Sequence, residues 1–247
     1  MQMTENPLTE TSRLSHVMLR VPSVDKTVEY WTRKGGSVLI SSKKEDDGPL
    51  TSAFVALGSS GATTEKCFGL ELISTTSPLK LGNIFQYIGV SMLLQFQHNL
   101  LGAATGEKPQ SEGKEPNGIL VSSAASAPGD FFSRISLKSI DLESTNQFYS
   151  NLLGMEVVAA DELMLCLRYK KQPYGVPITL IFEATEDELE MGNCFDHLVI
   201  GTTVNIEDQY ERIRSVGTIF MKPTNMFGKK IFGIRDPNGY KVILASD

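Results

Sequence analysis

The sequence predicts an α+β protein made of four diverged copies of one βαβββ module. Residues 14–25 align with residues 132–143 at a constant offset of 134 − 16 = 118 positions. A second pair of segments, 83–91 and 193–201, aligns at an offset of 197 − 87 = 110 positions. The tetrapeptides Glu-Pro-Asn-Gly and Asp-Pro-Asn-Gly, at 115–118 and 236–239, each precede a further apolar segment. Repetition of this kind is typical of a chain assembled from one supersecondary unit.

Modules one and three, at about 13–76 and 130–185, each predict a strand, a helix, a glycine stop and three more strands. Ser23 and Asp141 are N-cap candidates. Apolar residues at helical spacing follow each cap, as in Val24, Val28 and Trp31. The strands expected after the helices are 37–41, 51–57 and 68–74 in module one, and 156–160, 163–169 and 178–184 in module three.

Modules two and four, at about 81–125 and 192–247, are less alike. Ile206, Tyr210 and Ile213 predict a helix in module four. In module two, residues 102–118 are rich in Gly, Glu, Lys and Pro, which predicts a mobile loop in place of regular strands. The two halves of the chain, 13–125 and 130–247, are therefore expected to form two fused domains.

The composition argues against a nucleic-acid or membrane partner. The net charge is −6 and the basic residues are scattered, whereas phosphate binding needs a basic face. No stretch approaches the roughly 18 uncharged apolar residues of a membrane span. Three cysteines, an odd number without CxxC spacing, indicate a reducing compartment. We expect an intracellular soluble protein, in the cytoplasm or, if a presequence was removed, in an organelle stroma or matrix.

Four segments carry a resemblance to a known family. They are His-Val-Met-Leu-Arg-Val at 16–21, Gly-Leu-Glu-Leu at 69–72, the segment 192–201, and Asp-Pro-Asn-Gly-Tyr-Lys at 236–241. In this order the segments resemble the glyoxalase I family of the vicinal oxygen chelate superfamily, especially its fused two-domain plant lactoylglutathione lyases. The resemblance implies cupped mixed sheets in which module one faces module four and module two faces module three. It also implies that each pair offers a His or Gln from each first strand and a Glu from each last strand to a metal.

For the pair of modules one and four, the matching positions are His16, Glu71, His197 and Ile243, of which three can bind a metal. Two imidazoles and one carboxylate suit Zn, Ni, Mn or Fe as a divalent ion. We expect one such metal, with Glu71 acting both as a ligand and as the catalytic proton carrier. The alternative is a cup in which both histidines are hydrogen-bonded without a metal.

Alternation along the strands supports the shared site. It predicts that Leu14, His16 and Met18 lie on one face of their strand, with Ser15 and Val17 on the other. Of the three histidines in the chain, His16 and His197 occupy equivalent module positions. The third, His98, is interpreted as a surface or packing residue.

For the pair of modules two and three, the matching positions are Tyr87, Ser122, Arg134 and Glu183. This set is unsuited to a divalent metal, and we expect a second, degenerate cup that contacts substrate. Arg134 could bind a substrate carboxylate or pair with Glu183, and the ion pair is the favoured interpretation.

The resemblance implies isomerisation of the hemithioacetal of methylglyoxal and glutathione, with a metal polarising the substrate oxygens and a Glu moving the proton. We therefore expect a glyoxalase I-like metal-dependent lyase or isomerase acting on a small thiol adduct or a substrate derived from a 2-oxoaldehyde. One alternative is a non-catalytic small-molecule binder or scaffold with decayed sites. Another is an Fe(II) dioxygenase using the His-Glu-His set. Both half-sites lie in one chain, so a monomer is expected.

Overall fold

The structure is a computed structural model that describes most of the chain. The described residues are 6–33, 38–46, 48–56, 67–91, 112–114, 120–124, 132–170, 178–226 and 228–247. His98 and most of the predicted loop 102–118 lie outside these ranges. Within that loop, the structure does describe a short strand, β6 (Glu112–Lys114), where the sequence predicted none.

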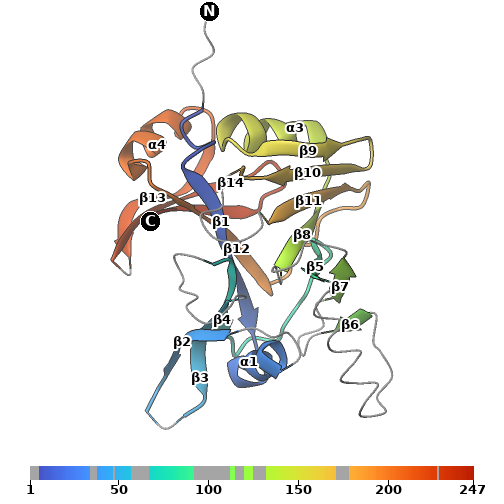
Figure 1. The fold of residues 1–247 in the computed structure, drawn as a ribbon, viewed down its shortest axis with the longest axis vertical. Helices are drawn as coiled ribbons and strands as arrows, with labels where there is room; N and C mark the ends of the chain where they lie inside the picture. The colour runs from blue at the N-terminus through green and yellow to red at the C-terminus, as the bar shows by residue number, and fades with distance from the viewer. Residues whose placement is uncertain are drawn as a thin grey trace, which may run out of the picture.

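The first sheet combines strands from the two ends of the chain. Its eight described strands, in spatial order, are β13 (Thr218–Met226), β14 (Lys229–Arg235), β15 (Lys241–Ser246), β12 (Phe195–Thr202), β1 (Ser12–Val21), β4 (Gly69–Ser74), β3 (Leu50–Ala56) and β2 (Val38–Lys44). Figure 1 shows β1, in blue, beside β12, in orange. Module one is thus joined to module four through an antiparallel pair at the centre of the sheet.

The second sheet joins modules two and three in the same way. Its seven described strands are β6, β7 (Leu120–Ala124), β5 (Phe85–Ser91), β8 (Phe132–Ser139), β11 (Thr179–Ala184), β10 (Met164–Arg168) and β9 (Glu156–Ala160). The central antiparallel pair here is β5 with β8. Both sheets therefore draw strands from both expected halves, 13–125 and 130–247, and the limits of those halves stay a prediction.

The helices begin where the sequence predicts. Before α1 (Val24–Arg33), the Ser23 hydroxyl accepts the Lys26 N–H, and before α3 (Leu142–Asn146), Asp141 accepts the Ser144 N–H. The helix α4 (Ile206–Ile213) is capped by Asn205. After α3, the chain continues in wider π-helical turns, η1 (Gln147–Leu152), in which the adjacent Phe148 and Tyr149 are both buried.

One hydrophobic core is shared by the two sheets. It contains Trp31 of α1 and Ile213 of α4, together with inward-facing residues of the central strands. Tyr240 connects the sheets, since its hydroxyl donates to the Lys138 carbonyl and its ring contacts both Phe195 and Phe182. All three cysteines are free thiols. No helix in the described part of the chain is long and apolar enough to cross a bilayer.

Candidate functional site

The strand register brings the three predicted metal ligands to one face of the first sheet. In the β1–β12 pair, His16 lies opposite Val199 and Met18 lies opposite His197. In the β1–β4 pair, Met18 is aligned with Glu71. Residues opposite one another on paired strands share a face, so His16, Glu71 and His197 surround Met18. We call this face of β4, β1, β12 and β15 the first cup.

The register also reveals a pseudo-twofold relation between modules one and four. It maps His16 onto His197, and it maps Glu71 onto Ile243, which is aligned with Val199. These are the same equivalences that the sequence alignment predicts. Ile243 is buried in a small apolar cluster with Val199 and Ala245, so the fourth position offers no ligand.

Each histidine follows a β-bulge, which the alternation pattern did not predict. The register skips Ser15 before His16 and Asp196 before His197. A bulge places one extra residue on its strand and re-aims the neighbouring side chains. This explains why the prediction that Leu14 shares the face of His16 is wrong: Leu14 is in the hydrophobic core with Val17.

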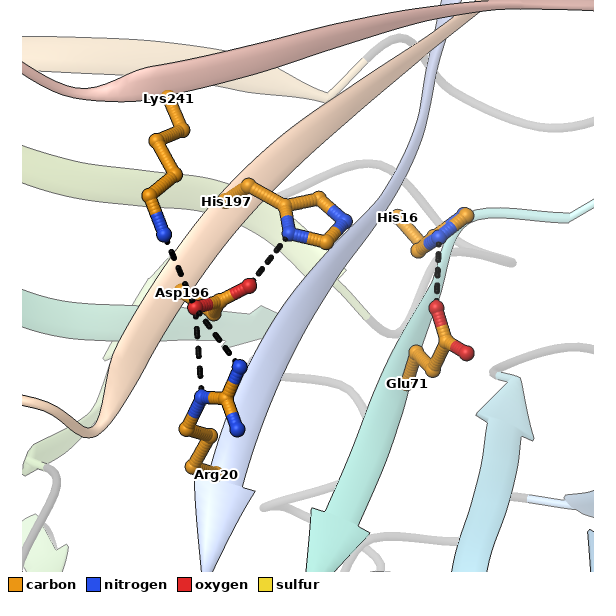
Figure 2. A network of polar contacts seen from close by, with 6 residues as sticks. All are labelled: His16, Arg20, Glu71, Asp196, His197 and Lys241. Carbon is orange, nitrogen blue, oxygen red and sulfur yellow. Dashed lines mark hydrogen bonds and ion pairs between the residues drawn. The ribbon is translucent and has the colours of Figure 1, made fainter. Parts of the chain in front are cut away.

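His16 and Glu71 form a close pair in the first cup. The Nε2 atom of His16 lies 3.1 Å from Oε2 of Glu71, and the Ser15 hydroxyl lies 3.1 Å from Nδ1 (Figure 2). Burial lowers the pKa of His16 despite the nearby carboxylate. The hydrogen bond from His16 holds the pKa of Glu71 below its usual value. At neutral pH the pair is therefore a neutral imidazole bonded to a carboxylate.

His197 contacts a carboxylate through Nδ1, whereas His16 contacts one through Nε2. The Nδ1 atom of His197 lies 2.8 Å from Oδ2 of Asp196, and Asp196 in turn contacts Arg20 and Lys241 (Figure 2). His197 also influences the pKa values of both His16 and Glu71, which places it near that pair. In Figure 2 the free side of the His197 ring, away from Asp196, faces the His16–Glu71 pair.

The three donors fit a divalent cation in kind and in the face that they share. Two ligands bound at about 2.1 Å to one ion lie roughly 3 Å apart, which is close to the His16–Glu71 separation. However, no three His, Cys, Asp or Glu side chains in the described ranges are gathered closely enough to share an ion. Binding would therefore have to bring His197 and the His16–Glu71 pair closer together.

Known proteins show the same architecture. The model of the Glyoxalase/Bleomycin resistance protein/Dioxygenase superfamily matches residues 132–244. Lactoylglutathione lyase GLX1 of Arabidopsis thaliana is 24% identical, over 98% of this chain and 94% of the relative. Lactoylglutathione lyase of Oryza sativa subsp. japonica is 22% identical, over 98% of this chain and 92% of the relative.

Solved structures agree over nearly the full length. Glyoxalase I from Zea mays aligns with a TM-score of 0.76 at 21% identity, covering 96% of this chain and 92% of that chain. A putative dioxygenase from Bacillus subtilis aligns with a TM-score of 0.71 at 14% identity, covering 97% of this chain and 86% of that chain. Residues 132–244 thus match the superfamily model, and the chain as a whole has the fold of the glyoxalase I structure. At these identities, the structural likeness establishes the fold.

The second sheet carries an equivalent face, which we call the second cup. Arg134 is paired with Gly89 as His16 is with Val199, and Ser136 is aligned with Ile181 as Met18 is with Glu71. The register position equivalent to Glu71 is thus Ile181, and Glu183 lies two residues beyond it. The backbone places Tyr87 and Ser122 at the other two positions, and their side chains lie outside the described part of the structure.

The predicted ion pair between Arg134 and Glu183 is wrong. Glu183 accepts a hydrogen bond from the Ser136 hydroxyl, and among the described ion pairs none joins Arg134 to Glu183. Arg134 is half-buried and near Cys166, whose pKa it acts to lower against the raising effect of burial. In the second cup, the guanidinium of Arg134 therefore lies near Cys166, which is paired with Ile181 on the neighbouring strand.

Three residues of the first cup were missed by sequence reasoning. Asp196, Arg20 and Lys241 form the polar network beside His197. Strict alternation places Asp196 on the face opposite His197, and only the bulge brings the two side chains together. The one usable signal was the Asp-His dipeptide at 196–197, a carboxylate directly before a candidate ligand.

Proposed function

We propose that the first cup binds one divalent metal ion and that the protein is a glyoxalase I-like lyase or isomerase. The observation that supports this most is the convergence of His16, Glu71 and His197 on one face, from opposite ends of the chain. When bound, a divalent cation supplies Lewis-acid polarisation of substrate oxygens. The relatives named lactoylglutathione lyase favour a small glutathione adduct as the substrate class.

The residues of the first cup would bind the ion and transfer the proton. His16 and His197 would hold the ion with neutral imidazole nitrogens, and Glu71 would hold it with a carboxylate oxygen. Glu71 is also the group best placed to accept and return a proton, because Ile243 stands where a second carboxylate would be. Asp196 is poorly suited to that role, since His197, Lys241 and Arg20 hold the pKa of its carboxyl well below its usual value.

Metal analysis of the purified protein tests the proposal. We expect about one equivalent of a divalent metal in the wild-type protein and a large loss in the His16→Ala/His197→Ala double variant. His98→Ala is the matched control, because the module alignment does not place His98 at a ligand position. Equal metal content in the wild-type and double-variant proteins would refute the metal site. Lyase activity with methylglyoxal and glutathione then tests the substrate class.

Because Ile243 occupies the fourth ligand position, the first cup also suits two other functions. Three ligands without a fourth are also the set used by Fe(II) enzymes that keep positions open for O₂ and substrate. Oxygen uptake by the Fe(II)-loaded protein with catechols, in the absence of lyase activity, would indicate that chemistry. A cup that binds no metal but retains small thiol adducts, measured by calorimetry, would indicate a non-catalytic binder.

The second cup is proposed to contact an anionic part of a small molecule without a metal. Arg134 supplies the charge, and Tyr87, Ser122 and Glu183 lie at or near the corresponding positions of the sheet. Binding of a glutathione analogue should weaken in Arg134→Met if this cup contributes. Unchanged binding would assign the interaction to the first cup alone.

The chain is also proposed to act as a monomer, because each cup is completed by strands of the same chain. Light scattering of the purified protein tests this, and a dimer mass would refute it. We also propose a location in the cytoplasm or in an organelle stroma or matrix; a relative named a chloroplastic probable lactoylglutathione lyase of Arabidopsis thaliana supports the second alternative. Imaging of a fluorescent fusion would distinguish the two.

A further inference from the structure

Asp196 owes its place in the first cup to the backbone. The β1–β12 register runs from Met18 opposite His197 to Leu19 opposite Phe195, so Asp196 has no partner across the ladder. At such a bulge, two successive side chains on one strand occupy the space opposite a single residue. The Asp196 carboxylate consequently lies beside the His197 imidazole, with Oδ2 at 2.8 Å from Nδ1.

Two cations fix the Asp196 carboxylate. The Nε and Nη2 atoms of Arg20 and the Nζ atom of Lys241 each lie 3.3 Å from Oδ1, and only 15% of the Asp196 side chain is exposed (Figure 2). An ionised carboxylate only accepts hydrogen bonds. The Nδ1 atom of His197 must therefore carry the hydrogen, which leaves the lone pair of a neutral imidazole on Nε2.

His16 has the opposite arrangement. Its Nε2 faces the Glu71 carboxylate at 3.1 Å and must donate, and its Nδ1 then accepts from the Ser15 hydroxyl at 3.1 Å. Ser15 is the bulge residue equivalent to Asp196. A hydroxyl can donate or accept, so Ser15 tolerates either tautomer of His16. The two related histidines thus differ in which nitrogen is free.

We propose that Asp196 is a positioning residue that presets His197 as the fixed ligand of the first cup, by holding the tautomer with a free Nε2. His16, in contrast, must move its hydrogen from Nε2 to Nδ1 and release Glu71 before both can bind an ion. The inference rests on the proposed metal site and adds an order to it: His197 is ready in the empty protein, whereas the His16–Glu71 pair rearranges. Loss of such an outer hydrogen-bond partner typically lowers metal affinity about 10–100-fold.

The first test measures zinc affinity by competition with a chromophoric chelator. We expect Asp196→Asn to weaken binding by about 10–100-fold. Ser15→Ala, the matched change at the equivalent bulge, should weaken it less. Lys241→Gln removes one of the two cations but keeps the Asp196–His197 contact, so it should give a smaller loss in the same direction. Thermal unfolding of each variant checks that it is folded.

The second test reads the tautomers directly, without metal. Nitrogen-15 NMR of the three imidazoles should show His197 protonated at Nδ1 and His16 protonated at Nε2, with His16→Gln, His98→Gln and His197→Gln providing the assignments. In Asp196→Asn, the His197 signals should move toward a mixture of tautomers while those of His16 remain. A general loss of structure would not produce that selective change.

The outcomes separate this inference from the proposed function. Wild-type protein that binds zinc, together with Asp196→Asn protein of equal affinity, overturns the positioning role and leaves the metal site standing. Wild-type protein that binds no zinc overturns the proposed function. That result also removes the order of ligand binding, and the NMR comparison then decides only whether Asp196 sets the His197 tautomer; an unchanged tautomer in Asp196→Asn overturns that as well.

Discussion

Asp236 should make the stability of this protein depend on pH. It is 5% exposed and lies in the Asp-Pro-Asn-Gly turn before β15. Its carboxyl accepts hydrogen bonds from the Tyr240 N–H at 2.7 Å and the Tyr149 hydroxyl at 3.2 Å. Burial outweighs these bonds and raises the pKa of Asp236 from 3.8 to about 7. The folded protein therefore keeps a proton that the unfolded chain releases near pH 4.

The sign and size of the effect follow from this difference in pKa. Between about pH 4 and pH 7 the folded state binds more protons than the unfolded state, so stability falls as pH rises. Between pH 5 and pH 8, stability is lost only up to the folded pKa of about 7, which is an interval of two pH units. At 1.36 kcal/mol per unit, the loss of unfolding free energy is about 2.7 kcal/mol. For a chain of this length, that is roughly 5–10 °C in Tm.

Urea unfolding of wild-type and Asp236→Asn proteins at pH 5 and pH 8 measures the effect. Asn keeps an oxygen for the Tyr240 N–H but does not titrate. The Asp236→Asn protein should therefore not lose this free energy of unfolding between pH 5 and pH 8. The lowered pKa of His16 gives the opposite slope, since stability then rises with pH through the His16 transition. That term is common to both proteins and cancels in the difference. Tyr149→Phe removes a donor to Asp236 and should raise its pKa further. Equal pH dependence in wild-type and Asp236→Asn proteins would refute the argument.

Two further predictions concern the first cup and the helix stop of module three. Ile243→Glu supplies a fourth ligand, the second carboxylate of the set, and should tighten zinc binding by about tenfold or more. Burying its charge beside Val199 and Ala245 should lower stability by about 1–3 kcal/mol. Chelator competition measures the zinc affinity and urea unfolding the stability, and weaker zinc binding would contradict the prediction. Gly154→Ala should cost more than about 1 kcal/mol, because Gly154 has φ +76° and an added Cβ would lie 2.8 Å from the Thr9 nitrogen; a urea midpoint equal to that of the wild-type protein would show that the turn relaxes.

Local patterns were sufficient to predict the modules and their pairing. Caps, helical spacing and repeated segments are properties of neighbouring residues, and the predicted helices appear at Ser23, Asp141 and 206–213. Alternation within each strand supported a shared site for His16, Glu71 and His197, but their common face depends on the register between β4, β1 and β12. The equivalence of Glu71 could not be carried to module three in this way. The offset falls from 118 at β1 to 181 − 71 = 110 at β4, so Ile181, and not Glu183, takes its place.

Bulges mark the limit of what alternation can predict. A bulge depends on the pairing of two distant strands, and its effect is to place adjacent side chains together. The first sheet has bulges at Ser15 and Asp196, and the second sheet has the equivalent irregularities at Ser133 and Gln86, where the β5–β8 register skips one residue on each strand. The same backbone device therefore recurs in all four modules, whatever the side chains.

The bulged backbone is present in both cups, although the side chains at the ligand positions differ. The second cup keeps the bulged backbone although Arg134 and Ile181 replace the histidine and the glutamate of the first cup. The architecture thus does not depend on a bound metal or on the ligand residues. It follows that substitutions at His16, Glu71, Asp196 or His197 should alter ion binding far more than folding. Deletion of Ser15 or Asp196 would instead remove the extra residue of a bulge. The residues that follow could keep their partners across the ladder, but the contact of that residue with His16 or His197 would be lost.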